Sequence, residues 1–226
     1  MGNLGLWEMQ TTPSARSDVR AEVTPRGLPE VVESYRDYEP QYPVAPIIRD
    51  LLRCVSRRYL GGLRSVTLTN SSGQGRHERR ATTISRGRKV DLIQSRGFYQ
   101  PAARGQKASI VLYVDNILGD RPPARHTFAL RLYAPFMRRI KFALVLYHEI
   151  GHHIHYTKLP QYREKENVAD RHKFRLLRRF YWRRWYLAPL AAIGLVLDPT
   201  GRSWLLKMAS FLWKKPRRKP VRQGKR

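Results

Sequence analysis

The amino-acid sequence predicts an α+β fold, in which a small mixed β-sheet packs on helices from the second half of the chain. Two observations predict this class. Short runs of alternating or β-branched apolar residues are concentrated between residues 64 and 114. Apolar residues at helical spacing dominate from residue 138 onwards. A chain of 226 residues is long enough for one domain with its own core, plus extensions.

The chain divides into four segments by composition. Residues 1–40 are polar, contain prolines and lack sustained periodicity, so we expect a flexible N-terminal arm. Residues 41–180 form the predicted domain. Residues 181–213 are apolar and aromatic and are expected to form a helical hairpin, and residues 214–226 a disordered basic tail. A basic helical extension is therefore expected after the domain.

The first half of the domain contains one helix and the strands of the sheet. An amphipathic helix is predicted at Val44–Tyr59, because one apolar stripe runs along it and two glycines follow it. Strands are predicted at Arg64–Thr69, Ala81–Ser85, Val90–Gln94 and Ser109–Val114. The last strand has the strongest pattern. Residues 119–137 form a proline-marked connection to the next helix.

Two helices in the second half are predicted to form a hairpin. The first runs from about Arg138 to Tyr156, where apolar residues recur at helical spacing. Leu159-Pro160 ends it, because a proline cannot continue a helix and restricts the residue before it. The second helix is expected to begin at Pro160 or Gln161, since proline is accepted in the first turn.

The first helix of the hairpin carries His148, Glu149 and His152 in the pattern H-E-x-x-H. Residues four apart on a helix lie on the same face, so the two imidazoles can bind one Zn²⁺ ion together. Glu149 is placed beside the first ligand, where a carboxylate acts as a base instead of binding the metal. A catalytic zinc site also needs a third protein ligand and a position for water.

The hairpin favours Glu166 as the third ligand. If the helices fold back near Leu159, residues at equal distances from that point meet. His152 and Glu166 each lie seven residues from Leu159, and His148 and Asp170 each lie eleven residues from it. Asp170 is therefore expected to accept the second N–H of a ligand histidine and to fix the orientation of its ring.

Other side chains compete for these roles. His155 returns to the ligand face, but one helix cannot easily direct three stacked imidazoles at one ion. His172 would complete a site of three histidines, although it lies off the face shared by Glu166 and Asp170. His153 points away from the ligand face and is expected to pack or to face solvent. Candidates for stabilising the oxyanion of the transition state are Tyr156, Tyr162 and His172, which the sequence does not separate.

The segment HEIGH followed by ENVAD resembles the gluzincin zinc metallopeptidases, in which H-E-x-x-H is followed by E-x-x-A-D or a close variant. The ImmA/IrrE-type peptidases share that arrangement, and the small single-domain minigluzincins are the most similar in size. The resemblance covers residues 96–180 and implies Glu166 as the third ligand, Glu149 as the base and Asp170 as the orienting residue. The interval between the second histidine and the glutamate is shorter here, which keeps a histidine open as the third ligand.

The resemblance also implies a role for the strand at Ser109–Val114. In gluzincin-like enzymes, a strand beside the active-site helix binds extended peptide along its free edge. Tyr113 and Asn116 would then line the substrate cleft. The alternative is a buried strand with Tyr113 in the core.

Charge and cysteine content bound the partners and the compartment. The chain has 44 Lys and Arg against 17 Asp and Glu, a net charge of +27, which favours nucleic acid or anionic lipid as a partner. The single cysteine, Cys54, excludes a disulfide framework within the chain and suits a reducing compartment. The N-terminus lacks the pattern of a secretory signal, so we predict a cytoplasmic protein.

The C-terminal region would make the protein peripheral to the membrane if it binds lipid. From Arg171 onwards, 17 Lys and Arg stand against one acidic residue, Asp198. The apolar runs Leu187–Leu197 and Trp204–Trp213 are shorter than the roughly 20 residues of a spanning helix. They fit a hairpin on an anionic membrane surface or two helices packed on the domain. The basic tail can hold nucleic acid or lipid headgroups without sequence preference.

The residues therefore predict a zinc metallopeptidase that hydrolyses a polypeptide substrate with a metal-bound water activated by Glu149. Two other functions remain open. One is a DNA-associated protease similar in layout to the SprT group, which has a third histidine ligand and a basic tail. The other is a non-catalytic basic protein that binds membrane or nucleic acid. The sequence does not indicate the oligomeric state.

Overall fold

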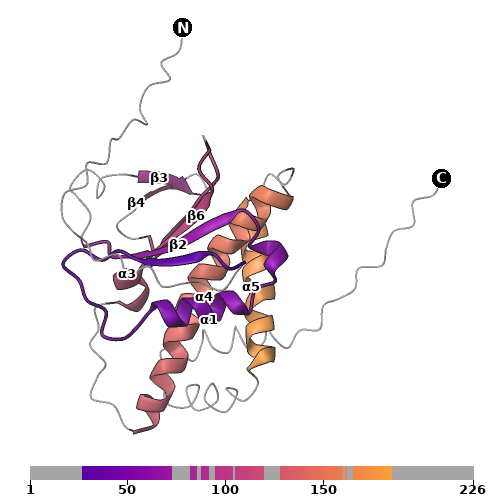
Figure 1. Cartoon of the computed structure of the whole chain (residues 1–226). Coiled ribbons are helices and arrows are strands. Elements are labelled where there is room, and N and C mark those ends of the chain that lie inside the picture. The colour runs from indigo at the N-terminus through magenta and orange to yellow at the C-terminus, as the bar shows by residue number, and fades with distance from the viewer. Residues whose placement is uncertain are drawn as a thin grey trace.

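The computed structural model describes residues 27–72, 82–85, 88–91, 95–103, 105–119, 128–159, 161 and 165–184. It confirms the predicted α+β class, because a small mixed sheet packs against helices (Figure 1). The strands lie in the first half of the chain, and two long helices follow them. This order places the predicted metal-binding residues on helices that pack beside the sheet.

The main sheet has four strands in the order β1-β2-β6-β5. The strands β1 (Glu30–Glu33), β2 (Leu63–Thr69) and β6 (Ala108–Tyr113) run parallel, and β5 (Gly97–Gln100) pairs antiparallel with β6. A separate hairpin consists of β3 (Thr82–Ser85) and β4 (Arg88–Asp91). Within the described residues, the short strand β5 therefore forms one end of the main sheet.

Helix α1 (Ala45–Arg53) connects β1 to β2 and is shorter than the predicted helix at Val44–Tyr59. Its apolar stripe is confirmed, since Ile48 and Leu51 are completely buried. After a turn, a 3₁₀ helix, η1, covers Arg57–Tyr59. A short helix α3 (Val114–Leu118) follows β6.

The long helices α4 (Phe128–Lys158) and α5 (Lys165–Arg183) pack along each other, and α4 also contacts α1, β5 and β6. The sequence predicts that the first of them begins near Arg138, but α4 begins ten residues earlier and contains Pro135. A proline inside a helix costs about 3 kcal/mol. Burying Phe136 offsets part or all of that cost, at about 1.5–3 kcal/mol.

Three strands differ from the sequence prediction. Strand β5 (Gly97–Gln100) is not among the predicted strands. The segment 1–40 is expected to be a flexible arm, yet β1 lies within it and pairs with β2 along its full length. Val31 in β1 is buried, so this strand contributes to the core. The strand expected at Val90–Gln94 is β4, which begins at Arg88 instead. A four-residue strand is too short to show a periodicity that would reveal its start.

Several predictions lie outside the described residues. These are the arm up to residue 26, Tyr162, the hairpin beyond residue 184 and the basic tail 214–226. Residues 181–184 at the start of the predicted hairpin belong to α5 and the turn after it. Among the helices that the structure describes, none combines the length and apolar character needed to cross a bilayer.

Candidate metal centre

At Gly151, beside the candidate metal-binding residues, the backbones of α4 and α5 approach each other unusually closely. A Cβ atom at this position would lie 2.5 Å from the carbonyl oxygen of Ala169 and 2.7 Å from its Cα. Only glycine lets the two helix backbones come this close. The contact fixes the part of α5 around Ala169 against the helical turn of α4 that carries the H-E-x-x-H residues.

We expect Gly151→Ala to destabilise the protein by roughly 2 kcal/mol or more, because the added methyl group meets backbone atoms that cannot rotate away. The gain in helix propensity from alanine, about 1 kcal/mol, offsets only part of this cost. Chemical denaturation measures the change. Gly61→Ala is the control, since nothing lies within 4 Å of its Cβ position. Equal stabilities of the two variants would contradict the close contact.

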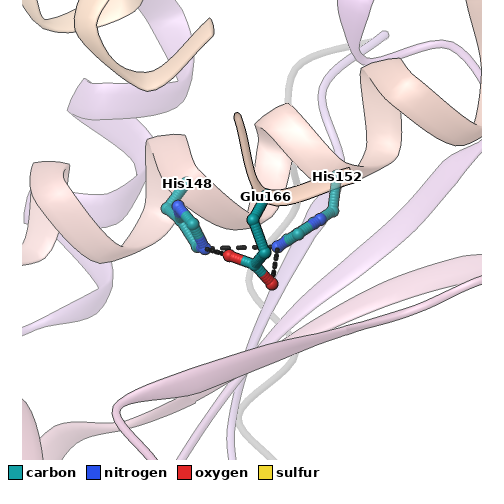
Figure 2. Close-up of side chains that lie close together, drawn as sticks. All are labelled: His148, His152 and Glu166. Carbon is teal, nitrogen blue, oxygen red and sulfur yellow. Dashed lines mark hydrogen bonds and ion pairs between the residues drawn. The ribbon is translucent and has the colours of Figure 1, made fainter. Parts of the chain in front are cut away.

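Three side chains of α4 and α5 converge on one point: His148, His152 and Glu166 (Figure 2). Their nearest ligand atoms all lie within 4.8 Å of one another. The Nε2 atoms of the two histidines are 3.2 Å apart, and the Glu166 carboxylate oxygens lie 3.4 Å and 3.7 Å from them. Two ligands about 2.05 Å from one tetrahedral ion lie about 3.3 Å apart. The three donors therefore lie close to the spacing that a single small cation requires.

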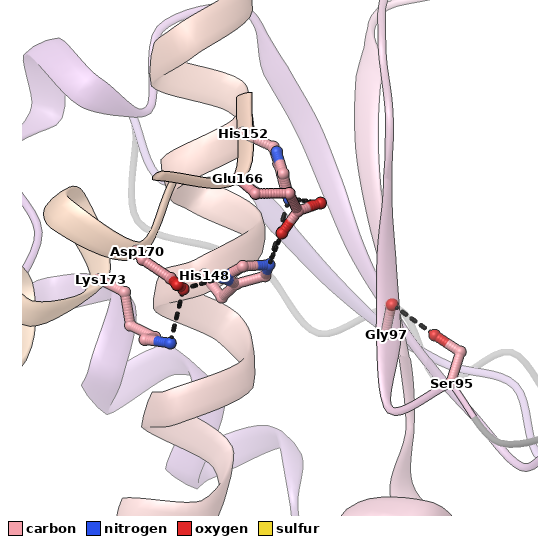
Figure 3. A network of polar contacts seen from close by, with 7 residues as sticks. All are labelled: Ser95, Gly97, His148, His152, Glu166, Asp170 and Lys173. Carbon is pink, nitrogen blue, oxygen red and sulfur yellow. Dashed lines mark hydrogen bonds and ion pairs between the residues drawn. The ribbon is translucent and has the colours of Figure 1, made fainter. Parts of the chain in front are cut away.

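Asp170 fixes the orientation of the first imidazole. The Nδ1 atom of His148 lies 3.0 Å from Oδ1 of Asp170, and Nζ of Lys173 lies 2.8 Å from the same oxygen (Figure 3). Burial alone would raise the pKa of Asp170, but the hydrogen bond and charge of Lys173, together with His148, lower it below its usual value. An ionised Asp170 accepts the Nδ1–H of His148, which leaves the lone pair of Nε2 directed at the cation position.

Both candidate histidine ligands are neutral at physiological pH. Burial lowers the pKa of His152 to about 4, and the neighbouring His148 adds to the effect. Burial also lowers the pKa of His148, followed by the charge of Lys173. Neutral imidazoles can donate their lone pairs to a metal.

Glu149 is buried beside the three converging side chains, with 6% of its surface exposed. Burial, and then the charge of Glu166, raise its pKa to about 8, whereas a hydrogen bond from the backbone N–H of Tyr99 acts in the opposite direction. A carboxylate with a pKa near neutrality is suited to exchanging protons in catalysis.

The raised pKa of Glu149 also predicts a pH dependence of stability in the metal-free protein. Its stabilising contribution is complete below the unfolded pKa of 4.5 and is lost as the pH rises through about 8. Glu149→Gln should therefore be more stable than the wild type at pH 9, by an amount on the order of 5 kcal/mol, and within about 1 kcal/mol of it at pH 5. Thermal melting in the presence of a chelator measures this. The same stability difference at both pH values would contradict the raised pKa of Glu149.

A third histidine, His153, connects the sheet to α4 through hydrogen bonds. The Nε2 atom of His153 lies 3.0 Å from the carbonyl oxygen of Gly61, to which it must donate a proton. Nδ1 of the same ring then accepts from the hydroxyl group of Tyr99 at 3.1 Å. His153 is buried, as the packing alternative predicts. Through Tyr99, it holds β5 against the turn of α4 that carries Glu149.

The remaining predicted residues lie in other surroundings. Within the described residues, neither rival histidine belongs to the group that can hold a metal. His155 is buried with its ring against Tyr156, and His172 packs edge-on against Tyr59 at 6.2 Å. Tyr156 is 41% exposed and its ring lies 5.5 Å from that of Tyr99. Of the two candidates for oxyanion stabilisation that lie within the described residues, Tyr156 and His172, Tyr156 is the one placed beside β5.

Sequence reasoning missed Tyr99 and Lys173. Tyr99 reaches Glu149 through a contact between residues about 50 positions apart, which no local pattern reveals. Lys173 could have been found, because it follows Asp170 by three residues and thus lies on the same helix face.

No family model, curated protein or solved structure matches this chain.

Proposed function

We propose that this protein is a zinc-dependent metallopeptidase with gluzincin-like ligands. The observation that supports it most is the convergence of His148, His152 and Glu166, whose ligand atoms lie within 4.8 Å of one another, beside the buried carboxylate of Glu149. Two imidazoles and one carboxylate leave a fourth position for water and substrate, which distinguishes a catalytic zinc site from a closed structural one.

When bound, zinc lowers the pKa of water and polarises the carbonyl group of the substrate. Glu149 takes a proton from the attacking water and passes it to the leaving nitrogen of the cleaved peptide. The backbone N–H of Tyr99 holds its carboxylate in place. A cation at the centre would offset the charge of Glu166 and so lower the pKa of Glu149, which favours the ionised form that accepts a proton.

The strand that would bind the substrate is β5 rather than β6. The sequence assigns this role to the strand at Ser109–Val114, but β6 pairs on both sides and Tyr113 is buried in the core. Asn116 donates its side-chain amide to the carbonyl oxygen of Ser95. Because of these contacts, neither the side chain of Tyr113 nor that of Asn116 has the predicted position in a substrate cleft.

Strand β5 lies at the end of the described sheet, so an extended peptide can pair with its outer edge. The N–H of Tyr99 is directed at Glu149 instead of at β6, so the same edge of the strand faces the centre. Figure 3 shows β5 opposite the metal-binding side chains, with the Gly97 carbonyl accepting a hydrogen bond from Ser95. A substrate pairing with this edge would place its backbone between Tyr99 and the cation.

The rival protease with three histidine ligands has less support. It needs His155 or His172 at the cation, and both rings pack against tyrosines instead. Glu166 is within 4 Å of both histidines of the motif.

Metal removal tests the proposal directly. Elemental analysis of the purified full-length chain should find about one zinc per molecule, since there is one group of three ligands in the described part of the chain. A casein cleavage assay should show hydrolysis that is lost with 1,10-phenanthroline and restored by added zinc. Hydrolysis that persists after the zinc has been removed would contradict the proposal.

A further inference from the structure

The outer face of α5 carries a row of arginines. At 100° per residue, Arg171, Arg175, Arg178, Arg179 and Trp182 lie within about 100° of the helix circumference. Four of the five are exposed and Arg178 is half-buried. The acidic residues of α5, Glu166 and Asp170, lie at the metal centre instead. We call this set of five residues the arginine face.

The arginine face continues onto the neighbouring elements. At its first half, the Tyr59 hydroxyl group accepts hydrogen bonds from Arg58 and Arg175. At its end, Arg183 donates to the carbonyl oxygen of Arg53 at 3.2 Å. Arg53, Arg57 and Arg58 are exposed as well. The basic surface thus extends from η1 along α5 to the end of α1.

The exposed side chain of Trp182 favours an anionic membrane over a nucleic-acid duplex as the partner of the arginine face. It is 69% exposed, the largest exposure among the large apolar side chains described. The phosphates of a nucleic-acid duplex would contact the arginines but not the indole of Trp182. Arginines beside an exposed tryptophan suit the interface of a bilayer, where both kinds of side chain find partners.

We infer that the arginine face docks the protein on an anionic membrane surface. The guanidinium groups contact lipid phosphates, and the indole of Trp182 enters the headgroup region. If the proposed peptidase activity holds, the substrates are polypeptide segments that lie close to that surface. The docking itself depends neither on zinc nor on Glu149.

Vesicle sedimentation with the full-length chain tests this inference. We expect binding to vesicles of phosphatidylcholine with phosphatidylserine, and much weaker binding to phosphatidylcholine alone. Replacing Arg171, Arg175 and Arg179 by glutamine should weaken binding about 100-fold, at about fivefold for each charge. Trp182→Ala should weaken vesicle binding about tenfold and leave binding to duplex DNA unchanged.

The control removes the same charge elsewhere. Arg36, Arg64 and Lys107 are exposed and lie at the strands instead of on α5, and their replacement by glutamine should change vesicle binding less than about threefold. Equal losses in the two triple variants, or wild-type binding by the α5 variant, would overturn the inference. So would Trp182-independent binding to DNA without binding to vesicles.

Two further measurements keep the result interpretable. Thermal melting checks that each variant folds, and Arg179→Glu alone replaces the triple variant if that variant melts early. Vesicle binding by Glu149→Gln should equal that of the wild type. A failure of docking therefore leaves the metallopeptidase proposal untouched, and the reverse also holds.

Discussion

Replacing Glu166 by alanine is expected to remove most of the bound zinc. Its carboxylate oxygens lie 3.4 Å and 3.7 Å from the two imidazole Nε2 atoms, so it provides one of three donors. We expect the zinc affinity to fall by more than the roughly 10–100-fold that results from losing a residue that only orients a ligand. Competition with a chromogenic chelator measures the affinity.

Asp170→Asn provides the graded comparison. This variant keeps the size of the side chain but loses the charge that holds His148 at 3.0 Å, so its zinc affinity should fall about 10–100-fold. His172→Gln and His155→Gln should retain zinc, because neither ring belongs to the converging group. Zinc retained by Glu166→Ala and lost from His172→Gln would exclude Glu166 and support a site of three histidines.

Replacing Glu149 by glutamine is expected to abolish peptide cleavage while zinc stays bound. Glutamine can still accept the hydrogen bond from Tyr99, but it cannot take a proton from water. Loss of a general base reduces turnover by about 100- to 10,000-fold, and kcat/KM for a fluorogenic peptide should fall accordingly. Zinc content is measured on the same samples.

Glu39→Gln is the matched control, since Glu39 is exposed and lies on a loop before α1. It should leave both zinc content and cleavage unchanged. Undiminished hydrolysis by Glu149→Gln would remove Glu149 from the mechanism, and loss of zinc from this variant would assign it a role in holding the metal.

The convergence of the candidate metal-binding residues could be predicted because it follows from helix geometry. His148 and His152 share a face through the helical repeat. Glu166 meets them because two consecutive helices fold back on each other, and equal distances from the fold identify the partners. Gly151 makes the pairing close enough, with Ala169 directly opposite. The helical repeat and the position of the turn between the two helices are therefore sufficient to predict that these side chains meet.

The surroundings of the centre could not be predicted in the same way. The strand β5 has four residues, and its place at the end of the sheet depends on pairing with β6. The early start of α4 depends on burial of Phe136 against other elements, which overrides the local effect of Pro135. Tyr99 reaches Glu149 only after the sheet and α4 have packed. These features arise from contacts between distant segments, so no local pattern contains them.

The imidazole of His153 joins three parts of the molecule that are distant in sequence: α4, the turn at Gly61 and β5 through Tyr99. Because the strand and the helix are bound to the same ring, they cannot slide past each other by one residue. If the proposed peptidase activity holds, a polypeptide aligned along β5 would therefore meet Glu149 at a defined position along the strand. Selection of the cleavage site would depend on which side chains fit on either side of that position.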